Sequence, residues 1–598
     1  MSASYILQAV DLKHVFKSQQ KHIEDTCALN NINMQIKAGE LTALVGPDGA
    51  GKTTFLRLIA GLYQPTAGQL DVLGLNVAEH SQAIQNQISY MPQRFGLYED
   101  LSIIENLNLY ADLHGVSQHV RQQRFERLLR ITDLAAFTKR LAGQLSGGMK
   151  QKLGLACTLV RSPELLLLDE PSVGVDPLSR RDLWGIIEKL VQEEKLNVII
   201  STAYMDEAER CDQVYVMYEG QVIQQGTPSQ LREYAQGRTW QAVPPKHMKA
   251  RVLQAALLDN TTLYCDAVPK GEVVRFITQE AYAAFPEQLL PQNIHAESRP
   301  AELEDAFMLI LHQTQQQSTP KALIQNNKED DQTSEALTFD QPNNSDEKVI
   351  SVQNLVRKFG DFTAVASTSF DVHRGEIFGL LGPNGAGKTT TFRMLCGLLP
   401  ASSGMLEVAG VNLRTARAHA RAKIGYVSQK FALYGNLSVH ENLKFFGGAY
   451  GLSGKRLKQQ IEKMLQQFHL KPEAKSGDLP AGFKQRLSMV AALLHEPEIL
   501  FLDEPTSGID PLARREFWHT IGELADRGIT IIVTTHFMEE AEYCDRIAIQ
   551  DAGKLLALGS PQEVRQQAGL HAGKDMNSAF IAIVEQARQV QSIEKESV

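Results

Sequence analysis

The sequence predicts two α/β domains in tandem, each built on a largely parallel sheet with flanking helices. Three observations lead to this prediction. The chain has 598 residues, which is too long for one hydrophobic core. The segment GPDGAGKTT, which starts at Gly46, returns as GPNGAGKTT at Gly382, and LLLLDEP with Asp169 returns as ILFLDEP with Asp503. Within each copy, apolar strand-like runs alternate with helical periodicity.

The first elements of a copy show this alternation. The run ELTALVG (40–46) predicts a strand that enters the glycine-rich segment, and KTTFLRLIAGL (52–62) predicts the helix that leaves it. A third repeat, YMPQRFGLYEDLSIIENL against YVSQKFALYGNLSVHENL, keeps the same register. The duplication therefore covers whole domains.

The domain boundaries follow from the repeats and from composition. We expect a first domain at 5–229, a small α/β appendix at 230–313, a linker at 314–348, a second domain at 349–562 and a helical tail at 563–598. The appendix mixes strand-like and helix-like patterns, and its end, DAFMLILHQ, resembles SAFIAIVEQ in the tail. The linker is poor in aromatic residues and rich in Gln, Asn, Ser and Asp, which is typical of a solvated connection.

Composition narrows the functional classes. The net charge of −9 makes nucleic acid an unexpected partner. The six cysteines form no C-x-x-C pair, which predicts a reduced, cytosolic protein without a cysteine metal site. The longest apolar runs, such as Leu165 to Leu168, are too short to span a bilayer, and the N-terminus does not resemble a secretory signal. If the protein works at a membrane, we expect another chain to supply the spans.

Two phosphate-binding loops are the clearest chemical signal. The pattern G-x-x-x-x-G-K-T occurs once in each copy, between a predicted strand and a predicted helix. Its glycines let successive backbone N–H groups point at phosphate oxygens, and the helix N-terminus favours the negative charge. A tight structural turn would explain one match, but not two in the same context. The predicted nucleotide-binding residues are Gly46, Pro47, Asp48, Gly49, Ala50, Gly51, Lys52, Thr53 and Thr54, with Gly382, Pro383, Asn384, Gly385, Ala386, Gly387, Lys388, Thr389 and Thr390.

An Asp-Glu pair ends an apolar strand in each copy. The aspartates Asp169 and Asp503 are placed to reach a magnesium ion beside the phosphate loop, together with the loop threonines Thr53 and Thr389. The glutamates Glu170 and Glu504 follow directly and are candidates to orient and deprotonate an attacking water. The alternative is a solvated strand end, which does not explain why each pair continues into P-S-V-G-V-D-P or P-T-S-G-I-D-P.

These motifs resemble the ATP-binding cassette (ABC) family over residues 5–228 and 349–562. The first copy also contains LSGGMKQ (145–151), which resembles the family signature. The resemblance implies P-loop ATPase domains, each with a small helical subdomain, and it implies ATP and Mg²⁺ as cofactors. It also implies that the domains pair head to tail, so that one domain's phosphate loop and the other's signature grip each ATP. Ser146, Gly147 and Gly148 would then contact the nucleotide held by the second copy.

The same resemblance implies roles for six further positions. Gln93 and Gln429 match the glutamine that senses magnesium, and Asp176 and Asp510 match an aspartate at the dimer contact. Phe16 and Phe359 lie where an aromatic ring often stacks on adenine. An ordinary strand or core aromatic is an equally good interpretation of these two residues.

The copies depart from the family pattern in complementary places. The second copy has His536 at the position of the switch histidine, which contacts the γ-phosphate, whereas the first copy has Ala203. The first copy has an intact signature, whereas the second reads LPAGFKQ (479–485), in which Pro480 replaces the serine. Under head-to-tail pairing both defects fall in one site. We therefore predict that the second phosphate loop and the first signature form the main hydrolytic site, with Glu504 and His536 as catalytic residues. Slow turnover at Glu170, and drift without functional consequence, remain alternatives.

A tandem ATPase of this kind can act on DNA, on the ribosome or on a membrane permease. A DNA-maintenance ATPase predicts long coiled-coil insertions within a cassette, and none is visible in the sequence. A soluble ATPase that acts on the ribosome is the alternative interpretation, and it predicts a long charged helical arm between the domains and two intact signatures. The segments that follow Gln93 and Gln429 resemble those on which exporter permeases dock. The resemblance extends to the tandem ATP-binding subunits of multidrug exporters. It implies two integral-membrane permease subunits as partners and a location at the cytoplasmic face of the inner membrane.

Overall fold

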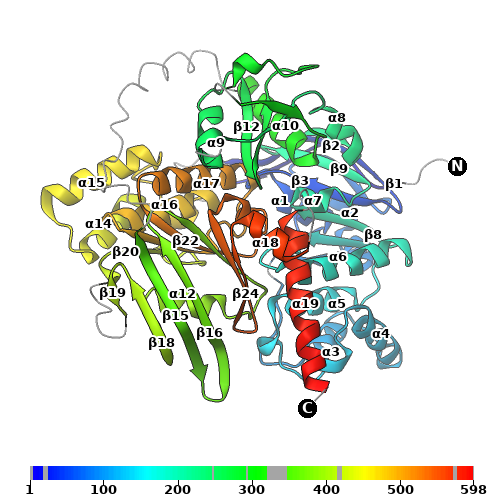
Figure 1. Cartoon of the computed structure of the whole chain (residues 1–598). Coiled ribbons are helices and arrows are strands. Elements are labelled where there is room, and N and C mark those ends of the chain that lie inside the picture. Colours follow the sequence, from blue (N-terminus) through cyan, green and yellow to red (C-terminus); the bar gives the residue numbers. More distant parts are fainter. Residues whose placement is uncertain are drawn as a thin grey trace.

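The fold is described from a computed structural model. It describes residues 5–17, 25–93, 95–245, 248–290, 294–318, 347–413, 420–569 and 575–596. Figure 1 shows the two copies side by side, with the appendix in green over helix α17 of the second copy. No described helix is long and apolar enough to cross a membrane.

The first copy contains two sheets. A six-stranded, mostly parallel sheet has the order β10-β9-β3-β8-β7-β6, and a four-stranded antiparallel sheet has the order β2-β1-β4-β5. The central strands are fully buried, which explains their continuous apolar runs. The strands are β1 (Tyr5–Phe16), β2 (Thr26–Lys37), β3 (Leu41–Val45), β4 (Ala67–Val72), β5 (Leu75–Asn76), β6 (Ile88–Met91), β7 (Leu165–Asp169), β8 (Asn197–Thr202), β9 (Gln213–Tyr218) and β10 (Gln221–Gly226).

Helices cover these sheets and form a separate helical subdomain. The subdomain consists of α3 (Ile103–Leu113), α4 (Gln118–Ile131) and α5 (Gly147–Leu159), whose inner faces share one apolar core. Ser102 and Glu105 form a capping box that starts α3. The remaining helices are α1 (Lys52–Ile59), α2 (Val77–Gln87), α6 (Pro177–Gln192), α7 (Met205–Ala208) and α8 (Pro228–Glu233), with 3₁₀ turns η1 (Ala135–Phe137) and η2 (Ala142–Gln144).

The second copy repeats this architecture. Its sheets have the orders β20-β21-β22-β17-β23-β24 and β16-β15-β18-β19. The strands are β15 (Lys348–Phe359), β16 (Phe362–His373), β17 (Ile377–Leu381), β18 (Ser403–Val408), β19 (Val411–Asn412), β20 (Ile424–Val427), β21 (Ile499–Asp503), β22 (Thr530–Thr535), β23 (Arg546–Asp551) and β24 (Lys554–Gly559). The helices are α12 (Lys388–Leu395), α14 (Val439–Ala449), α15 (Gly454–Gln467), α16 (Ala481–Leu493) and α17 (Pro511–Asp526), with 3₁₀ turns η6 (Ser476–Asp478) and η7 (Glu540–Tyr543).

The appendix is a small α/β unit with its own core. Its antiparallel sheet has the order β12-β13-β11-β14, and Trp240 and Phe276 pack against Leu253 and Leu257 of helix α9. Its elements are β11 (Thr239–Ala242), α9 (Ala250–Leu258), β12 (Tyr264–Lys270), β13 (Val273–Thr278), η3 (Glu287–Leu289), β14 (Ala296–Ser298) and α10 (Leu303–Ser318).

The segments around the predicted linker and tail differ slightly from the predicted boundaries. Helix α10 continues to Ser318, so the first residues of the predicted linker are helical, because its apolar face packs on α7 and α8. The rest of that linker, 319–346, lies outside the described residues. The tail consists of α18 (Pro561–Gln567) and α19 (Met576–Glu596), and 570–574 and 597–598 lie outside the described residues.

The appendix and the tail form ion pairs between the copies. Arg515 on α17 pairs with Asp266 at 3.2 Å and with Glu304 at 2.7 Å, both from the appendix. On the tail, Glu585 pairs with Arg181 on α6 at 2.8 Å. The appendix therefore packs against both copies, since its helix α10 also contacts α7 and α8 of the first copy.

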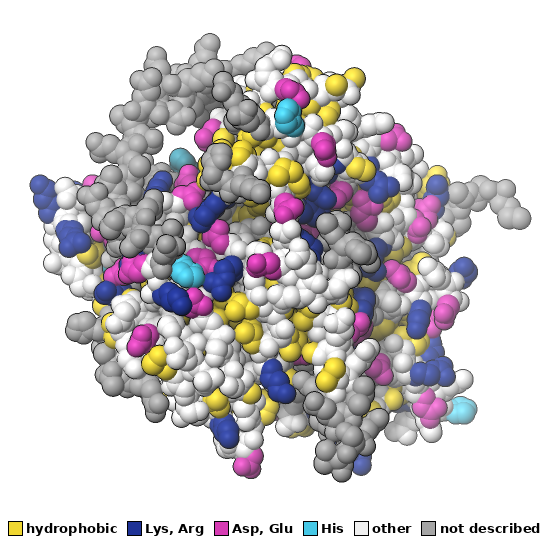
Figure 2. Space-filling view, viewed as in Figure 1, with side chains coloured by type: hydrophobic (Ala, Val, Ile, Leu, Met, Phe, Trp, Pro, Cys, Tyr) yellow, Lys and Arg dark blue, Asp and Glu magenta, His cyan; other side chains and the backbone are white. Residues whose placement is uncertain are grey.

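The surface charge is mixed. Figure 2 shows acidic and basic side chains interspersed over one face, without a broad field of either sign. On that face the described side chains form no continuous basic stripe of the kind that tracks a phosphate backbone.

Candidate nucleotide sites

Each phosphate loop turns directly into a helix. Gly51 and Gly387 precede α1 and α12 with φ of 100°, a left-handed conformation that favours glycine. A Cβ at Gly51 would lie 2.8 Å from the carbonyl oxygen of Ala28, so the loop also needs glycine for space. Lys52 Nζ donates to the carbonyl oxygen of Gly46 at 2.7 Å, and Lys388 Nζ donates to that of Gly382 at 2.5 Å. Both lysines therefore lie inside their loops.

The predicted magnesium residues of the first copy gather at the end of β7. Thr53 Oγ1 donates to Asp169 Oδ1 at 3.0 Å, and Gln93 Nε2 donates to Glu170 Oε2 at 2.6 Å. Lys52 Nζ lies 3.9 Å from Glu170 Oε1. A hydroxyl and a carboxylate side by side are hard oxygen donors of the kind that Mg²⁺ takes together with phosphate oxygens and water, so these residues fit that ion.

The second copy adds a histidine to the equivalent cluster. Gln429 Nε2 donates to Glu504 Oε2 at 2.6 Å, and His536 Nδ1 lies 3.2 Å from the same carboxylate oxygen. Asp503 Oδ1 accepts from Thr534 Oγ1 at 2.6 Å. The His536 side chain is buried. Thr389 is the second residue of α12, as Thr53 is of α1.

The backbone at both catalytic candidates is strained. Glu170 has φ of 48° and Glu504 has φ of 45°, and each precedes a proline, which further restricts its conformation. The backbone N–H of each glutamate donates a hydrogen bond of 3.0 Å. The acceptor is Ser201 Oγ in the first copy and Thr534 Oγ1 in the second. Strained backbone of this kind concentrates at functional sites.

The loops of each copy contact the other copy. The backbone N–H of Asp48 lies 3.4 Å from Asp510 Oδ2, and Asn384 Nδ2 lies 3.5 Å from the carbonyl oxygen of Gly174. A Cβ at Gly147 would lie 3.0 Å from Asn384 Nδ2. The second phosphate loop therefore contacts the first signature, and each loop contacts the turn that follows the other copy's Asp-Glu pair.

Comparison with known proteins identifies the family. The family model "ABC transporter" matches residues 29–173 and 365–507. The chain is 47% identical over 569 residues to "Probable multidrug ABC transporter ATP-binding protein YbhF" of Escherichia coli (strain K12), a match that covers 94% of this chain and 95% of that protein. The chain belongs to the ABC transporter family. It is an ATPase with two ATP-binding cassettes in one polypeptide.

Two other relatives match a single cassette's length. The "Linearmycin resistance ATP-binding protein LnrL" of Bacillus subtilis (strain 168) is 42% identical over 224 residues, which are 37% of this chain and 72% of that protein. A solved "ATP binding subunit of ABC transporter" is 29% identical with a TM-score of 0.37, and the match covers 40% of this chain and 99% of that one.

The two ABC signatures differ at the helix start. Ser146 caps α5 by accepting from the backbone N–H of Met149 at 3.3 Å, whereas Pro480 precedes α16 without a side-chain cap. A Cβ at Gly148 would lie 2.1 Å from Ser179 Oγ, so this signature glycine packs closely against α6. Asp176 and Asp510 cap α6 and α17.

The histidine changes the electrostatics of one site. Burial alone would raise the pKa of Glu504, but contact with His536, with help from Lys388 and Gln429, holds that pKa below its usual value. In the first cassette, burial raises the pKa of Glu170, and Lys52 and Gln93 offset this only in part. The two glutamates therefore occupy opposite electrostatic environments.

The predicted adenine-stacking residues end their strands at the surface. Phe16, the last residue of β1, is 39% exposed, and Phe359, the last residue of β15, is 46% exposed. Phe16 makes edge contacts with His14 and Tyr63. Exposure of this size makes the core interpretation wrong for both rings, and their stacking on adenine stays a prediction.

Sequence reasoning missed two groups of site residues. Tyr90 donates its hydroxyl to Asp169 Oδ2 at 3.0 Å, and Tyr426 occupies the matching position beside Asp503. The signal was present, because a tyrosine stands three residues before the glutamine in both copies. The second group consists of Ser201 on β8 and Thr534 on β22, whose hydroxyls donate to Asp169 and Asp503. These two residues are recognisable only from their contacts.

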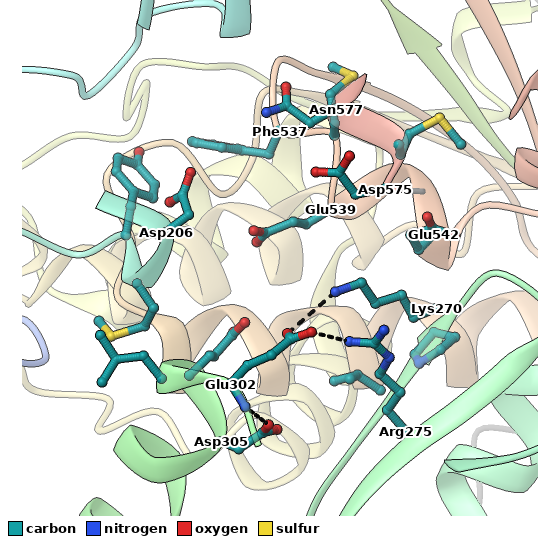
Figure 3. A pocket seen from close by; sticks show the side chains of 18 of the residues that line it. Asp206, Lys270, Arg275, Glu302, Asp305, Phe537, Glu539, Glu542, Asp575 and Asn577 are labelled. Carbon is teal, nitrogen blue, oxygen red and sulfur yellow. Dashed lines mark hydrogen bonds and ion pairs between the residues drawn. The ribbon is translucent and has the colours of Figure 1, made fainter. Parts of the chain in front are cut away.

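A separate cavity of about 290 Å³ lies where the first cassette, the appendix and the second cassette meet. Figure 3 shows Glu302 held by Lys270 and Arg275, with Glu539 and Asp575 across the space. None of its lining residues belongs to a phosphate loop. It is therefore distinct from the nucleotide sites.

Proposed function

We propose that this chain is the ATP-hydrolysing subunit of a drug or antibiotic exporter and that it drives two integral-membrane permease subunits. The observation that carries this proposal is the similarity to a probable multidrug transporter subunit along nearly the whole of both chains. In this arrangement the protein works at the cytoplasmic face of the inner membrane.

Exposed apolar side chains support a permease partner. Tyr98 and Leu113 of the first cassette are 55% and 67% exposed, and Tyr434 and Phe445 of the second are 47% and 51% exposed. All four lie in the segments that follow Gln93 and Gln429. Tyr98 and Tyr434 occupy the same position in the two cassettes. Exposed aromatic and aliphatic side chains of this kind are typical of a surface that another subunit covers.

The two nucleotide sites use the predicted residues. In this proposal the phosphate loops bind ATP, Lys52 and Lys388 contact its phosphates, and Mg²⁺ supplies positive charge between phosphate oxygens when bound. Thr53, Gln93 and Asp169 would hold that ion in the first site, and Thr389, Gln429 and Asp503 in the second.

The second phosphate loop and the first signature form the main hydrolytic site in this proposal. Glu504 accepts a proton from the attacking water, and His536 orients that carboxylate and contacts the γ-phosphate. The contact of Gly147 with Asn384 and the pairing of Glu504 with His536 support this assignment. The first site has Glu170 but Ala203 in place of the histidine, so its role is mainly to hold ATP.

The assignment of the hydrolytic site is tested by two matched substitutions. Glu504→Gln is expected to lower steady-state ATP hydrolysis by at least about 100-fold, because it removes the base at the working site. Glu170→Gln is expected to leave most of the activity. Equal losses in the two variants would refute the asymmetric arrangement.

The partner is tested by purification from detergent-solubilised membranes with a tag on this chain. Recovery of two permease subunits for each copy of this chain supports the proposal, whether the two subunits are identical or different. Recovery of ribosomal particles instead would support a soluble tandem ATPase that acts on the ribosome.

A further inference from the structure

A buried glutamate joins the two catalytic loops of the second cassette. Glu540, in the turn η7, accepts from Thr535 Oγ1 at 2.6 Å through one carboxylate oxygen and from Thr506 Oγ1 through the other. All three side chains are fully buried. Hydrogen bonds to a buried carboxylate are stronger than those between neutral groups.

The two threonines flank the catalytic candidates. Thr535 directly precedes His536, and its hydroxyl also accepts from the backbone N–H of Phe537 at 2.9 Å. This hydrogen bond connects the residues on both sides of the histidine. Thr506 lies two residues after Glu504. The two hydrogen bonds of Glu540 therefore connect the segment that contains His536 with the segment that follows Glu504. We call this connection the bridge.

The first cassette has the same glutamate but lacks the complete bridge. Glu207 accepts from Thr202 Oγ1 at 2.6 Å, as Glu540 does from Thr535. Its other oxygen, Oε1, is buried without a hydrogen-bond partner, and so is the hydroxyl of Ser172, which stands where the second cassette has Thr506. Serine lacks the β-methyl group that restricts threonine to few rotamers, so its hydroxyl is not held toward the glutamate.

The bridge also lies next to the first cassette. Arg514 Nε is 4.0 Å from Glu540 Oε1, and the same guanidinium lies 5.1 Å from the ring centroid of Phe537 and 5.7 Å from that of Tyr204. Tyr204 belongs to the first cassette and directly follows Ala203. A guanidinium over two aromatic rings is a favourable packing arrangement.

We propose that Glu540 is a positioning residue for ATP hydrolysis, which holds His536 against Glu504 through Thr535 and Thr506. The open bridge at Glu207 is then a further difference between the sites, added to the missing histidine and the altered signature. This inference rests on the proposed assignment of the second site as the hydrolytic one.

The test removes one hydroxyl from each cassette of the full-length protein. Thr506→Val keeps the side-chain shape and breaks only the bridge, and we expect kcat to fall at least about tenfold while the KM for ATP changes less than about twofold, because positioning acts on the reacting geometry. The matched control Ser172→Ala removes a hydroxyl that has no partner, and we expect kcat within twofold of the wild type. Thr506→Ser is expected to lie between the wild type and Thr506→Val.

A structural role alone predicts a different pattern. A Thr506→Val protein with kcat within twofold of the wild type, or a Ser172→Ala loss as large as that of Thr506→Val, overturns the proposal. Glu504→Gln, measured in the same series, distinguishes failure of the positioning role from failure of the site assignment. If Glu504→Gln abolishes hydrolysis and Thr506→Val does not, only the positioning role fails; if Glu504→Gln keeps hydrolysis, the site assignment fails.

Discussion

His536 Nδ1 lies 3.2 Å from Glu504 Oε2, and the matching position beside Glu170 is occupied by Ala203. An alanine methyl group can neither orient a carboxylate nor contact a phosphate. The two candidate glutamates share a strained backbone, a glutamine partner and a buried lysine, so the histidine is the clearest chemical difference between their immediate surroundings.

Replacing the histidine tests this difference. We expect His536→Ala to lower ATP hydrolysis by about 100-fold or more, which is the usual cost of removing a group that acts in the transition state. Phosphate release under saturating ATP measures the effect. The control Ala203→Gly should keep activity within twofold, and a comparable loss in that variant would contradict the assignment.

The contact between Asp48 and Asp510 predicts a pH dependence. Burial, and then the carboxylate of Asp510, raise the pKa of Asp48 to about 6, while Lys52 acts in the opposite direction. Because the pKa is raised from the ordinary value of 3.8, folding and cassette pairing together take up a proton between these values, and the share from Asp510 belongs to pairing. The stabilisation from this group is therefore complete below pH 3.8 and is lost as the pH rises through about 6.

We expect nucleotide-free cassettes to pair more tightly at pH 5.5 than at pH 7.5, by a factor of up to about four. Energy transfer between one dye on each cassette measures the pairing. Asp48→Asn introduces the residue that the second loop carries as Asn384, and its pairing should not change with pH over this range. An unchanged slope in that variant would assign the pH dependence to another group.

The signature glycine Gly148 offers a steric test. An added Cβ would lie 2.1 Å from Ser179 Oγ and 2.3 Å from its Cβ, so Gly148→Ala must displace α6 or the signature. We expect ATP hydrolysis to fall at least about tenfold, because displacement of an ångström at a site is costly. Gly185→Ala, where a Cβ meets no atom within 4 Å, is the control and should keep full activity. Recovery in the double variant Gly148→Ala/Ser179→Gly would confirm the steric cause.

The Arg515 contacts test how the appendix is attached. Arg515→Ala leaves the buried carboxylate of Asp266 and the partly buried carboxylate of Glu304 without their guanidinium, and we expect a loss of about 3 kcal/mol in the free energy of unfolding. Arg181→Ala removes an exposed ion pair with Glu585 and should cost about 1 kcal/mol or less. Urea unfolding followed by intrinsic fluorescence compares the two, and equal losses would mean that the appendix contributes nothing to the packing of the second cassette.

The fold and the chemistry of the loops were predictable because they depend on local patterns. The phosphate loops, the Asp-Glu pairs and the replacement of a histidine by Ala203 can all be read from short segments. The appendix's packing could not be predicted, because Asp266 and Arg515 are far apart in the chain and no pattern pairs them. The Glu540 bridge also escaped prediction, since it depends on side-chain rotamers that distinguish Thr506 from Ser172 only in three dimensions.

The ion pairs between the appendix and α17 have a consequence for the kinetics of the ATPase cycle. They connect the cassettes away from the phosphate loops, and both cassettes belong to one chain, so we expect the cassettes to stay together when nucleotide leaves. Closure onto new ATP is then an intramolecular step, whose effective concentration is set by the tether and not by the amount of protein. Separate cassettes have to find each other by diffusion, whereas hydrolysis per molecule of this chain should stay constant on dilution.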